Sequence, residues 1–270
     1  MVDVPPEVLA RLGPSPIELS RSDSARVLSG GGLVAKIGQA DRCAREALIL
    51  GGLSALLTFD VPELVDQGDG WILMLELSAD SETERGVEPL VAIGAMHETF
   101  QDASGLANPL LRDVFGREFD TLLTASRSVA ADLPEPLASV QLDPSALREA
   151  LDAHPHTLVH GDARRDNVTV GRDGFAWFDW EEAGAAPAAF DVARWIHGSL
   201  TATPSIDPDA ELAAYLSDRT TVEDPAAFRR AVDAAAVLSF LVLDLTANGG
   251  AELPAGVVER RNLMARNLLG

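Results

Sequence analysis

One short segment of the chain carries side chains that suit phosphoryl transfer. Asp162 and Asn167 lie in the run His160–Asn167, and Asp179 follows twelve residues after Asn167. Transfer to a hydroxyl needs a carboxylate that accepts the hydroxyl proton, then an amide oxygen and a second carboxylate that hold Mg²⁺ on the phosphates. A His-Gly-Asp tripeptide by itself is only a turn signal. Because residue type, order and spacing all agree, we predict Asp162 as the catalytic base and Asn167 and Asp179 as metal ligands.

A cation for the nucleotide phosphates would complete such a site. The 21 basic residues of the chain are 20 arginines and one lysine, Lys36. A chain that uses arginine for most of its cations is expected to keep lysine where a compact ammonium matters. Lys36 lies in the apolar run Leu33–Ile37, and Glu46 follows ten residues later. We expect Lys36 to contact the α- and β-phosphates and Glu46 to orient it. The alternative is a solvated lysine at the edge of a strand.

The glycine run Gly30–Gly32 is not expected to cover the phosphates. It ends only four residues before Lys36, whereas the covering loop joins the first two strands and the lysine lies on the third. We predict instead that the glycines form the hairpin turn into the strand of Lys36. The covering loop is then 21–24. It lacks glycine, and the hydroxyls of Ser22 and Ser24 would donate to the phosphates in its place.

The elements that position these residues follow from apolar periodicity and turn signals. Strands are predicted at 17–20, 25–28, 33–37, 157–159 and 168–170, with a strand hairpin over 61–75. Helices are predicted at 5–12, 41–50, 86–100, 108–131, 208–217, 225–247 and 255–268, and another begins at Asp143–Pro144. For the helix at 41–50, Asp41 is the predicted N-cap and Gly51–Gly52 the predicted end.

Together these residues resemble the aminoglycoside phosphotransferase and choline kinase-like family, the small-molecule branch of the protein-kinase-like fold. The resemblance rests on Lys36, Glu46, the loop His160–Asn167 and Asp179, and it spans most of the chain. It implies a two-lobed α+β fold. The N-terminal lobe would be a small antiparallel sheet with one helix, and the larger C-terminal lobe would be mostly helical.

The resemblance also implies where the lobes meet and where the nucleotide binds. The first lobe would span 1–76 and the second 77–270. Glu76 and Leu77 would form a hinge whose backbone groups meet the purine, with Met74 near the base. The donor would be ATP or GTP, with Mg²⁺. The family pattern further implies a bracing role for an aspartate after the metal ligand, and Phe190-Asp191-Val192-Ala193 is similar to that element.

Composition limits the classes of function. The chain has 270 residues, 47% of them hydrophobic, which is enough for two lobes with a sizeable core. The single Cys43 excludes an internal disulfide, and the N-terminus has no signal-peptide pattern, so we expect a cytoplasmic protein that uses no membrane. A net charge of −21 argues against nucleic acid as a partner. We expect a monomer or a homodimer.

The acceptor is the least determined part of the function. The negative charge would attract a cationic small molecule such as an aminoglycoside-like antibiotic, or it is only a solubilising surface. We expect five carboxylates in the lobe that would wall the acceptor: Glu181, Glu182, Asp207, Asp209 and Glu211. The alternatives are a metabolite kinase of the choline, homoserine or sugar type, and a pseudokinase that only binds nucleotide.

Overall fold

The computed structural model describes residues 2–21, 25–77, 88–101, 108–113, 116, 118–129, 133–170, 175–198, 207–217, 219, 224–245 and 255–270. The chain packs into two compact units. The first comprises Met1–Pro89, Asn108–Leu111 and Asp166–Ala183, and the second comprises Leu90–Ala107, Arg112–Arg165 and Gly184–Gly270. These units differ from two lobes divided at residue 76, because Asp166–Ala183 packs with the N-terminal sheet and helix.

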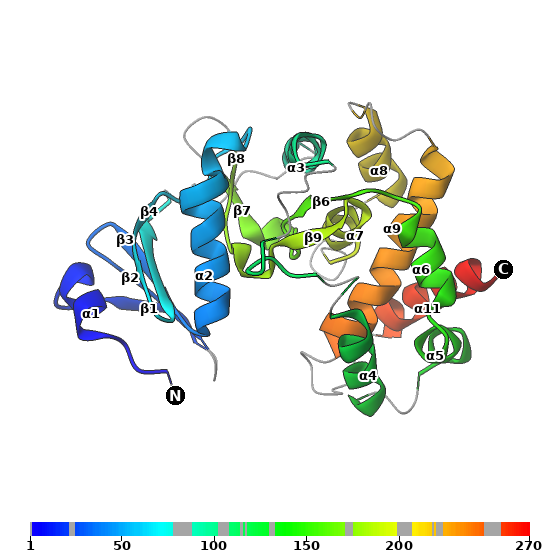
Figure 1. The fold of residues 1–270 in the computed structure, drawn as a ribbon, viewed down its shortest axis with the longest axis horizontal. Coiled ribbons are helices and arrows are strands. Elements are labelled where there is room, and N and C mark those ends of the chain that lie inside the picture. The colour runs from blue at the N-terminus through cyan, green and yellow to red at the C-terminus, as the bar shows by residue number, and fades with distance from the viewer. Residues whose placement is uncertain are drawn as a thin grey trace. The chain divides into compact units, whose positions relative to one another are not determined.

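The first unit is built on a five-stranded antiparallel sheet (Figure 1). Its strands are β1 (Ile17–Arg21), β2 (Arg26–Gly30), β3 (Leu33–Ile37), β4 (Leu64–Gly68) and β5 (Trp71–Leu75), in the order β1-β2-β3-β5-β4. Its helices are α1 (Pro6–Leu12) and α2 (Ala40–Leu48), and the hairpin β7 (Val168–Val170) and β8 (Phe175–Trp177) completes it. This arrangement confirms the predicted antiparallel sheet and the hairpin over 61–75.

The turn between β2 and β3 is the predicted glycine hairpin. Gly31 and Gly32 have φ of 61° and 77°, and consecutive positive φ values are what a two-residue hairpin turn requires. The register pairs Val27 with Lys36 and Lys36 with Ile72, so Lys36 lies on the central strand of the sheet. Apolar side chains from α1 and this sheet form the core of the unit: Val8, Leu12, Leu28, Ala35, Ile37, Trp71 and Leu73.

Helix α2 differs from its prediction at both ends. Asp41 lies in the first turn and does not cap the helix, which begins at Ala40 after Gln39. The winding does not end at the glycines either, because a π-helical turn over Ile49–Leu53 continues it through them. The side chains of Ile49 and Leu50 are buried. We attribute the extra turn to their packing, which outweighs the helix-ending tendency of glycine.

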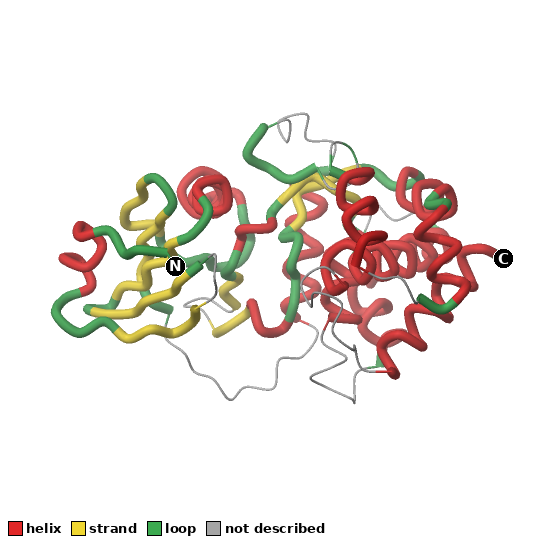
Figure 2. The backbone as a smooth tube through the Cα atoms, turned by 90° about the horizontal axis from the view of Figure 1, so that it is seen from below, coloured by secondary structure: helices red, strands yellow, loops and turns green. Residues whose placement is uncertain are grey.

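The second unit is mainly helical (Figure 2). Its helices are α3 (Glu88–Thr99), α4 (Phe119–Val129), α5 (Glu135–Leu142), α6 (Ser145–Asp152), α7 (Ala189–Gly198), α8 (Pro208–Ser217), α9 (Pro225–Ser239) and α11 (Ala255–Leu269). Strands β6 (His156–Val159) and β9 (Gly184–Pro187) pair in an antiparallel sheet of two. Helix α9 is central, since α6, α7 and α11 all pack on it, and a π-helical turn over Phe240–Asp244 extends it.

Two predictions for this unit were wrong or incomplete. The predicted helix 108–131 begins only at Phe119, because the backbone of Arg112 bridges Gly184 and the carboxylate of Glu118 accepts the Asp113 N–H. Helix α5 and strand β9 were not predicted.

None of the helices in the described part of the chain is long and apolar enough to span a membrane.

Candidate active site

A cavity of about 600 Å³ lies within the first unit, between the sheet and the β7–β8 hairpin. Its lining residues are Leu19, Ser20, Val27, Val34, Lys36, Glu46, Pro62, Met74, Leu75, Glu76, Leu77, Thr169, Phe178 and Asp179. Most of the wall is apolar, and a few charged groups converge at one place, as in sites for small ligands. The predicted nucleotide residues Lys36, Glu46, Met74, Glu76 and Leu77 are therefore brought together here.

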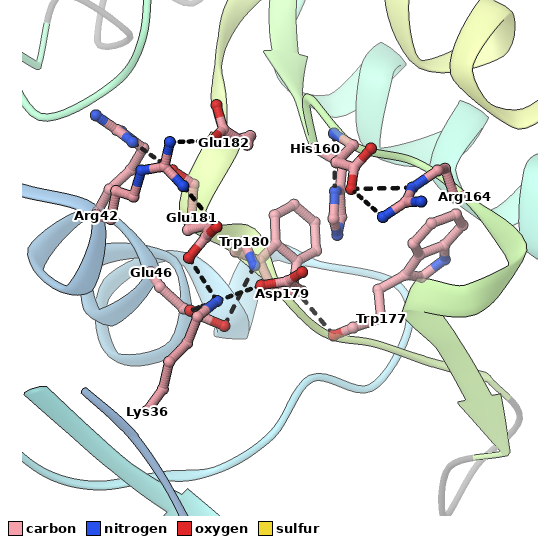
Figure 3. Close-up of polar contacts among 12 residues, drawn as sticks. Lys36, Arg42, Glu46, His160, Arg164, Trp177, Asp179, Trp180, Glu181 and Glu182 are labelled. Atoms are coloured by element: carbon pink, nitrogen blue, oxygen red, sulfur yellow. Dashed lines mark hydrogen bonds and ion pairs between the residues drawn. The ribbon is translucent and has the colours of Figure 1, made fainter. Parts of the chain in front are cut away.

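The ammonium of Lys36 is the centre of the charged group (Figure 3). Its Nζ lies 2.9 Å from Oε2 of Glu46 and 2.8 Å from Oε2 of Glu181, and it donates to Oδ1 of Asp179. Burial alone would lower the pKa of Lys36, but the three carboxylates raise it above its ordinary value. Burial raises the pKa of Glu46, and Lys36 opposes that rise. Lys36 is therefore a permanently charged cation at the wall of the cavity.

Glu46 also binds the backbone next to Asp179, one of the predicted metal ligands. Its Oε1 accepts the backbone N–H of Trp180 at 3.2 Å, while Oε2 accepts from Lys36. Because Glu46 is 1% exposed, this carboxylate is fixed from both sides. One residue of α2 thus ties the lysine of β3 to the backbone next to Asp179.

The β7–β8 hairpin brings the predicted metal ligands to one end. Val168 pairs with Trp177, and the N–H of Phe178 donates to the carbonyl of Asn167 at 3.1 Å, so Asn167 and Asp179 lie just beyond the paired ends. Among the described residues, Asp179 alone combines a side chain with a positive φ, at 67°. Their amide and carboxylate oxygens are a donor set that suits Mg²⁺.

The backbone of the predicted hinge forms hydrogen bonds with the sheet. The N–H of Leu75 donates to the carbonyl of Glu63 at 2.9 Å, and the N–H of Glu76 donates to that of Gly32 at 3.0 Å. The side chain of Glu76 accepts the hydroxyl of Ser29 at 2.8 Å. These bonds hold the strand end that carries Leu77 at the mouth of the cavity. Ser22 and Ser24, the predicted phosphate donors, lie outside the described residues.

Asp162, the predicted base, belongs to the second unit. Its Oδ1 accepts Nε of Arg194 at 3.1 Å and also Nη2, and its Oδ2 accepts Nε and Nη2 of Arg164 at 3.0 and 2.9 Å. Burial alone would raise the pKa of Asp162, but the guanidinium groups of Arg194 and Arg164 lower it to about 2. The carboxylate is therefore fully ionised at neutral pH.

The loop around Asp162 is braced by Asp191, as the family resemblance implied. Its two oxygens accept the backbone N–H groups of His160 and Gly161 at 2.7 and 2.9 Å. Behind it, Nε2 of the buried His97 lies 3.1 Å from Asp191, and the hydroxyl of Tyr215 lies 2.9 Å from Nδ1 of His97. Burial lowers the pKa of His97, so its ring is neutral. This buried chain fixes the start of the loop.

The five carboxylates expected near an acceptor have other partners. Glu181 and Glu182 belong to the first unit, where Arg42 of α2 binds them at 2.9 and 3.3 Å. Their expected place in the acceptor-facing lobe was wrong, because the turn after β8 packs on α2.

The other three carboxylates lie on or beside α8. Asp207 accepts the N–H of Asp209 at the start of the helix, Asp209 pairs with Arg229 at 2.6 Å, and Glu211 binds Arg165 at 2.6 Å and Nε1 of Trp195 at 2.7 Å. Each therefore has a local structural role.

Two contributors were missed by the sequence reasoning. Arg194 binds Asp162, and Arg42 binds the two glutamates that follow Asp179. A signal for Arg194 was present, because it follows Asp191 by three residues and residues so spaced share a face of a helix. Arg42 had no such signal, since its partners Glu181 and Glu182 are 139 and 140 residues away in the sequence.

Solved structures of several kinases share this fold. A choline/ethanolamine kinase family protein from Mesorhizobium loti is 20% identical, with a TM-score of 0.63 over 98% of this chain and 90% of that chain. The microcompartment-associated aminopropanol kinase is 15% identical, with a TM-score of 0.64 over 94% and 90%. The complex of APH(2″)-IIa with streptomycin and ATP is 14% identical, with a TM-score of 0.62 over 94% and 97%.

The sequence itself decides the family. No curated protein matches the chain. Residues 19–231, however, match the description Phosphotransferase enzyme family (APH), and this span contains Lys36, Glu46, the loop His160–Asn167 and Asp179. The protein-kinase-like fold predicted from those residues is confirmed. The chain therefore belongs to the phosphotransferase enzyme family and is a small-molecule phosphotransferase that acts on a hydroxyl group.

Proposed function

We propose that the protein transfers the γ-phosphoryl group of ATP or GTP to a hydroxyl of a small molecule, with Mg²⁺. The observation that carries the proposal is the cavity of the first unit, where Lys36 and its partner Glu46 share one wall with Asp179. An apolar slot beside a fixed cation suits a purine with its phosphates. The base would lie between the apolar side chains near Met74, and the backbone of Leu77 would meet its edge.

In this reaction the acceptor oxygen forms a bond to the γ-phosphorus while the bond to the β,γ-bridging oxygen breaks, so that a nucleoside diphosphate leaves. The hydroxyl proton passes to Asp162. A carboxylate with a pKa of about 2 is a weak base for an unactivated alcohol. Asp162 therefore acts first as a hydrogen-bond acceptor that orients the hydroxyl, and it takes the proton as the new bond forms.

Asn167 and Asp179 would hold Mg²⁺. Their oxygens suit this ion, and the side chain of Asp179 is 34% exposed. When bound, the ion neutralises charge on the phosphates. Lys36 would contribute the second positive charge, and Glu46 would keep its ammonium directed into the cavity. Ser22 and Ser24 remain the proposed donors from the covering loop.

For the acceptor, we propose an amino alcohol or an aminoglycoside-like antibiotic. The solved relatives include kinases named for ethanolamine and aminopropanol and a complex with streptomycin, and ethanolamine and aminopropanol carry an amine with the hydroxyl. The net charge of −21 supports a cationic acceptor through long-range attraction. The five carboxylates discussed above no longer add to this argument, because each is bound within the fold. A role in antibiotic resistance would follow from an antibiotic acceptor.

The test is a phosphorylation assay with a panel of aminoglycosides, peptide and nucleoside antibiotics, amino-sugars and choline, with ATP and GTP as donors. For any acceptor found, Asp162→Asn should lower kcat by about 10² to 10⁴-fold, because the base is lost, while the Kd for MgATP stays within about twofold.

Wild-type turnover in Asp162→Asn would refute the assignment of the base. The pseudokinase alternative makes the opposite prediction for the native protein, namely tight MgATP binding with no transfer to any member of the panel.

A further inference from the structure

The carboxylate of Asp162 is held by two arginine forks within the second unit. Arg194 donates Nε at 3.1 Å and Nη2 to Oδ1, and Arg164 donates Nε at 3.0 Å and Nη2 at 2.9 Å to Oδ2. A carboxylate offers about four acceptor positions, and the two forks supply four donors. An acceptor hydroxyl that donates to Asp162 must therefore replace at least one of these N–H groups.

The two arginines are not equivalent. The side chain of Arg194 is 10% exposed, and its Nη1 also donates to Oδ1 of Asp244 at 3.1 Å, so it is fixed from the far side. The side chain of Arg164 is 36% exposed and belongs to the catalytic loop itself. Releasing Arg194 would leave a buried charge without its partner, which is costly, whereas Arg164 can turn toward solvent.

We propose that Arg194, anchored by Asp244, is a positioning residue that fixes Oδ1 of Asp162, and that Arg164 gives up Oδ2 to the acceptor hydroxyl. This inference rests on the proposed role of Asp162 as the base. It divides the carboxylate into a fixed oxygen and an exchangeable one. Arg194 acts on the reaction only through Asp162.

Helix α7 explains how the fixed half is built. Asp191 and Arg194 are three residues apart and share a face of the helix. Asp191 accepts the backbone N–H groups of His160 and Gly161, and Arg194 binds the side chain of Asp162. One turn of one helix therefore holds both the backbone and the carboxylate of the catalytic loop. Two N–H groups of the Arg194 guanidinium converge on Oδ1, an arrangement of fixed donors that the single ammonium of a lysine would not reproduce.

The charges around Asp162 support the assignment. On the loop itself, Arg164 and the ring of His160 lie next to Asp162. The Nδ1 of His160 accepts the backbone N–H of Asp162 at 3.3 Å. From α7 come Arg194 and Asp191, the latter bonded to the loop backbone. Behind Arg194 lie two further charges that act on it, Asp244 after α9 and Arg261 of α11. Removing Arg194 takes away one of the two guanidinium groups that lower the pKa of Asp162, so that pKa should rise.

The experiment compares Arg194→Met, Arg194→Lys and Asp244→Asn with the control Arg229→Met. Arg229 and Asp209 form an exposed ion pair in the same unit, at 2.6 Å, so the control removes an arginine and an ion pair away from the loop. The probes are MgATP hydrolysis, with water as acceptor, and phosphorylation of an acceptor found in the panel. Folding is checked by near-UV circular dichroism.

Arg194→Met should lower kcat about 100-fold with the KM for MgATP within about twofold, and the acidic limb of the kcat profile should move to higher pH than in the wild type. Arg194→Lys should keep the limb closer to its wild-type position, because the charge is retained, yet lose about tenfold in kcat, because the paired N–H donors of the guanidinium are lost. Asp244→Asn should also lower kcat. In the double variant with Arg194→Met it should lower kcat little further, because both substitutions weaken the contact of Arg194 with Asp162. Arg229→Met should match the wild type.

The carboxyl ¹³C resonance of Asp162, assigned from its absence in Asp162→Asn, gives a readout that does not require turnover. Its titration should move to higher pH in Arg194→Met. A folded Arg194→Met with native kcat, or with low kcat but an unmoved titration, would overturn the inference. If Asp162→Asn is inactive while Arg194→Met behaves as the wild type, only this inference fails. If Asp162→Asn stays active, the proposed function of Asp162 fails first.

Discussion

At the scale of single residues, Asp179 combines the side chain of a proposed metal ligand with an unusual backbone conformation. Its φ of 67° and ψ of 55° are in the left-handed region, which asparagine and aspartate tolerate better than other side chains do. Strained conformations of this kind cluster at functional sites. Here the conformation turns the chain directly after β8 and brings the carboxylate to Lys36. Aspartate therefore suits this position for two reasons, the left-handed backbone and the proposed metal binding.

These two requirements separate in a pair of substitutions. Asp179→Asn keeps a residue that tolerates the left-handed backbone and removes the negative charge. It should therefore abolish the Mg²⁺ dependence of nucleotide binding with little loss of folding stability. Asp179→Ala should lose the same dependence and be less stable than Asp179→Asn by about 1 kcal/mol, from the left-handed backbone. Nucleotide titrations with and without Mg²⁺, and urea unfolding, measure the two effects. Retained Mg²⁺ dependence in Asp179→Asn would refute the metal assignment.

At the scale of elements, α1 approaches the β2–β3 hairpin closely. A Cβ built on Gly30 would lie 2.4 Å from the carbonyl oxygen of Leu12, a backbone atom at the end of α1. The core of the first unit depends on this approach, because Val8 and Leu12 of α1 are buried against the sheet. Glycine is therefore required at position 30 by the close packing of α1, whereas glycine at positions 31 and 32 is favoured by the positive φ values of the turn.

Gly30→Ala should lower the free energy of unfolding by about 1 to 3 kcal/mol, because the backbone of α1 must move away from the sheet. The matched control is Gly256→Ala in the first turn of α11, where an added Cβ meets nothing within 4 Å. The control should be neutral or more stable by up to about 1 kcal/mol, from helix propensity. Urea unfolding compares both with the wild type. Equal stability of the two variants would show that α1 adjusts without cost.

At the scale of the whole molecule, buried histidines make stability depend on pH. His197 is 7% exposed, and burial, with the nearby Arg261 and Arg260, lowers its pKa to about 3; burial also lowers that of His97. Between pH 3 and 6.5 the unfolded chain therefore binds protons that the folded protein does not, and stability falls as the pH is lowered through this range. Asp162 affects stability at lower pH, because its stabilising contribution is lost only as the pH falls from about 4 toward 2.

His197→Gln removes one of these groups. Lowering the pH from 7.5 to 5.0 should cost the wild type up to about 2 kcal/mol more than it costs the variant, because each pH unit below the unfolded pKa of 6.5 contributes about 1.4 kcal/mol. Urea unfolding at the two pH values measures the difference, and the comparison isolates His197 from groups common to both proteins. An identical pH dependence would mean that the pKa of His197 is the same in the folded and unfolded states.

Local patterns determined much of the site. The glycine turn, the strand of Lys36 and the order of Asp162, Asn167 and Asp179 were all readable, because turns and adjacent strand pairs depend on a few neighbouring residues. The same holds for α8, which begins at Pro208 as the Asp-Pro signal predicts. From these residues the sequence determined the family, the fold and the candidate residues of the reaction.

The tertiary structure decided the partners of the other charged groups. Arg194 binds Asp162 across 32 residues, and Glu181 reaches Arg42 across 139. The spacing of Arg194 from Asp191 indicates a shared helix face, but it does not identify Asp162 as the partner. The pattern of a helix shows which face is buried, but it does not identify the group on the opposite side. For that reason the acidic residues after Asp179 were readable from the sequence as charges, and the packing of their turn on α2 decided that they bind Lys36 and Arg42.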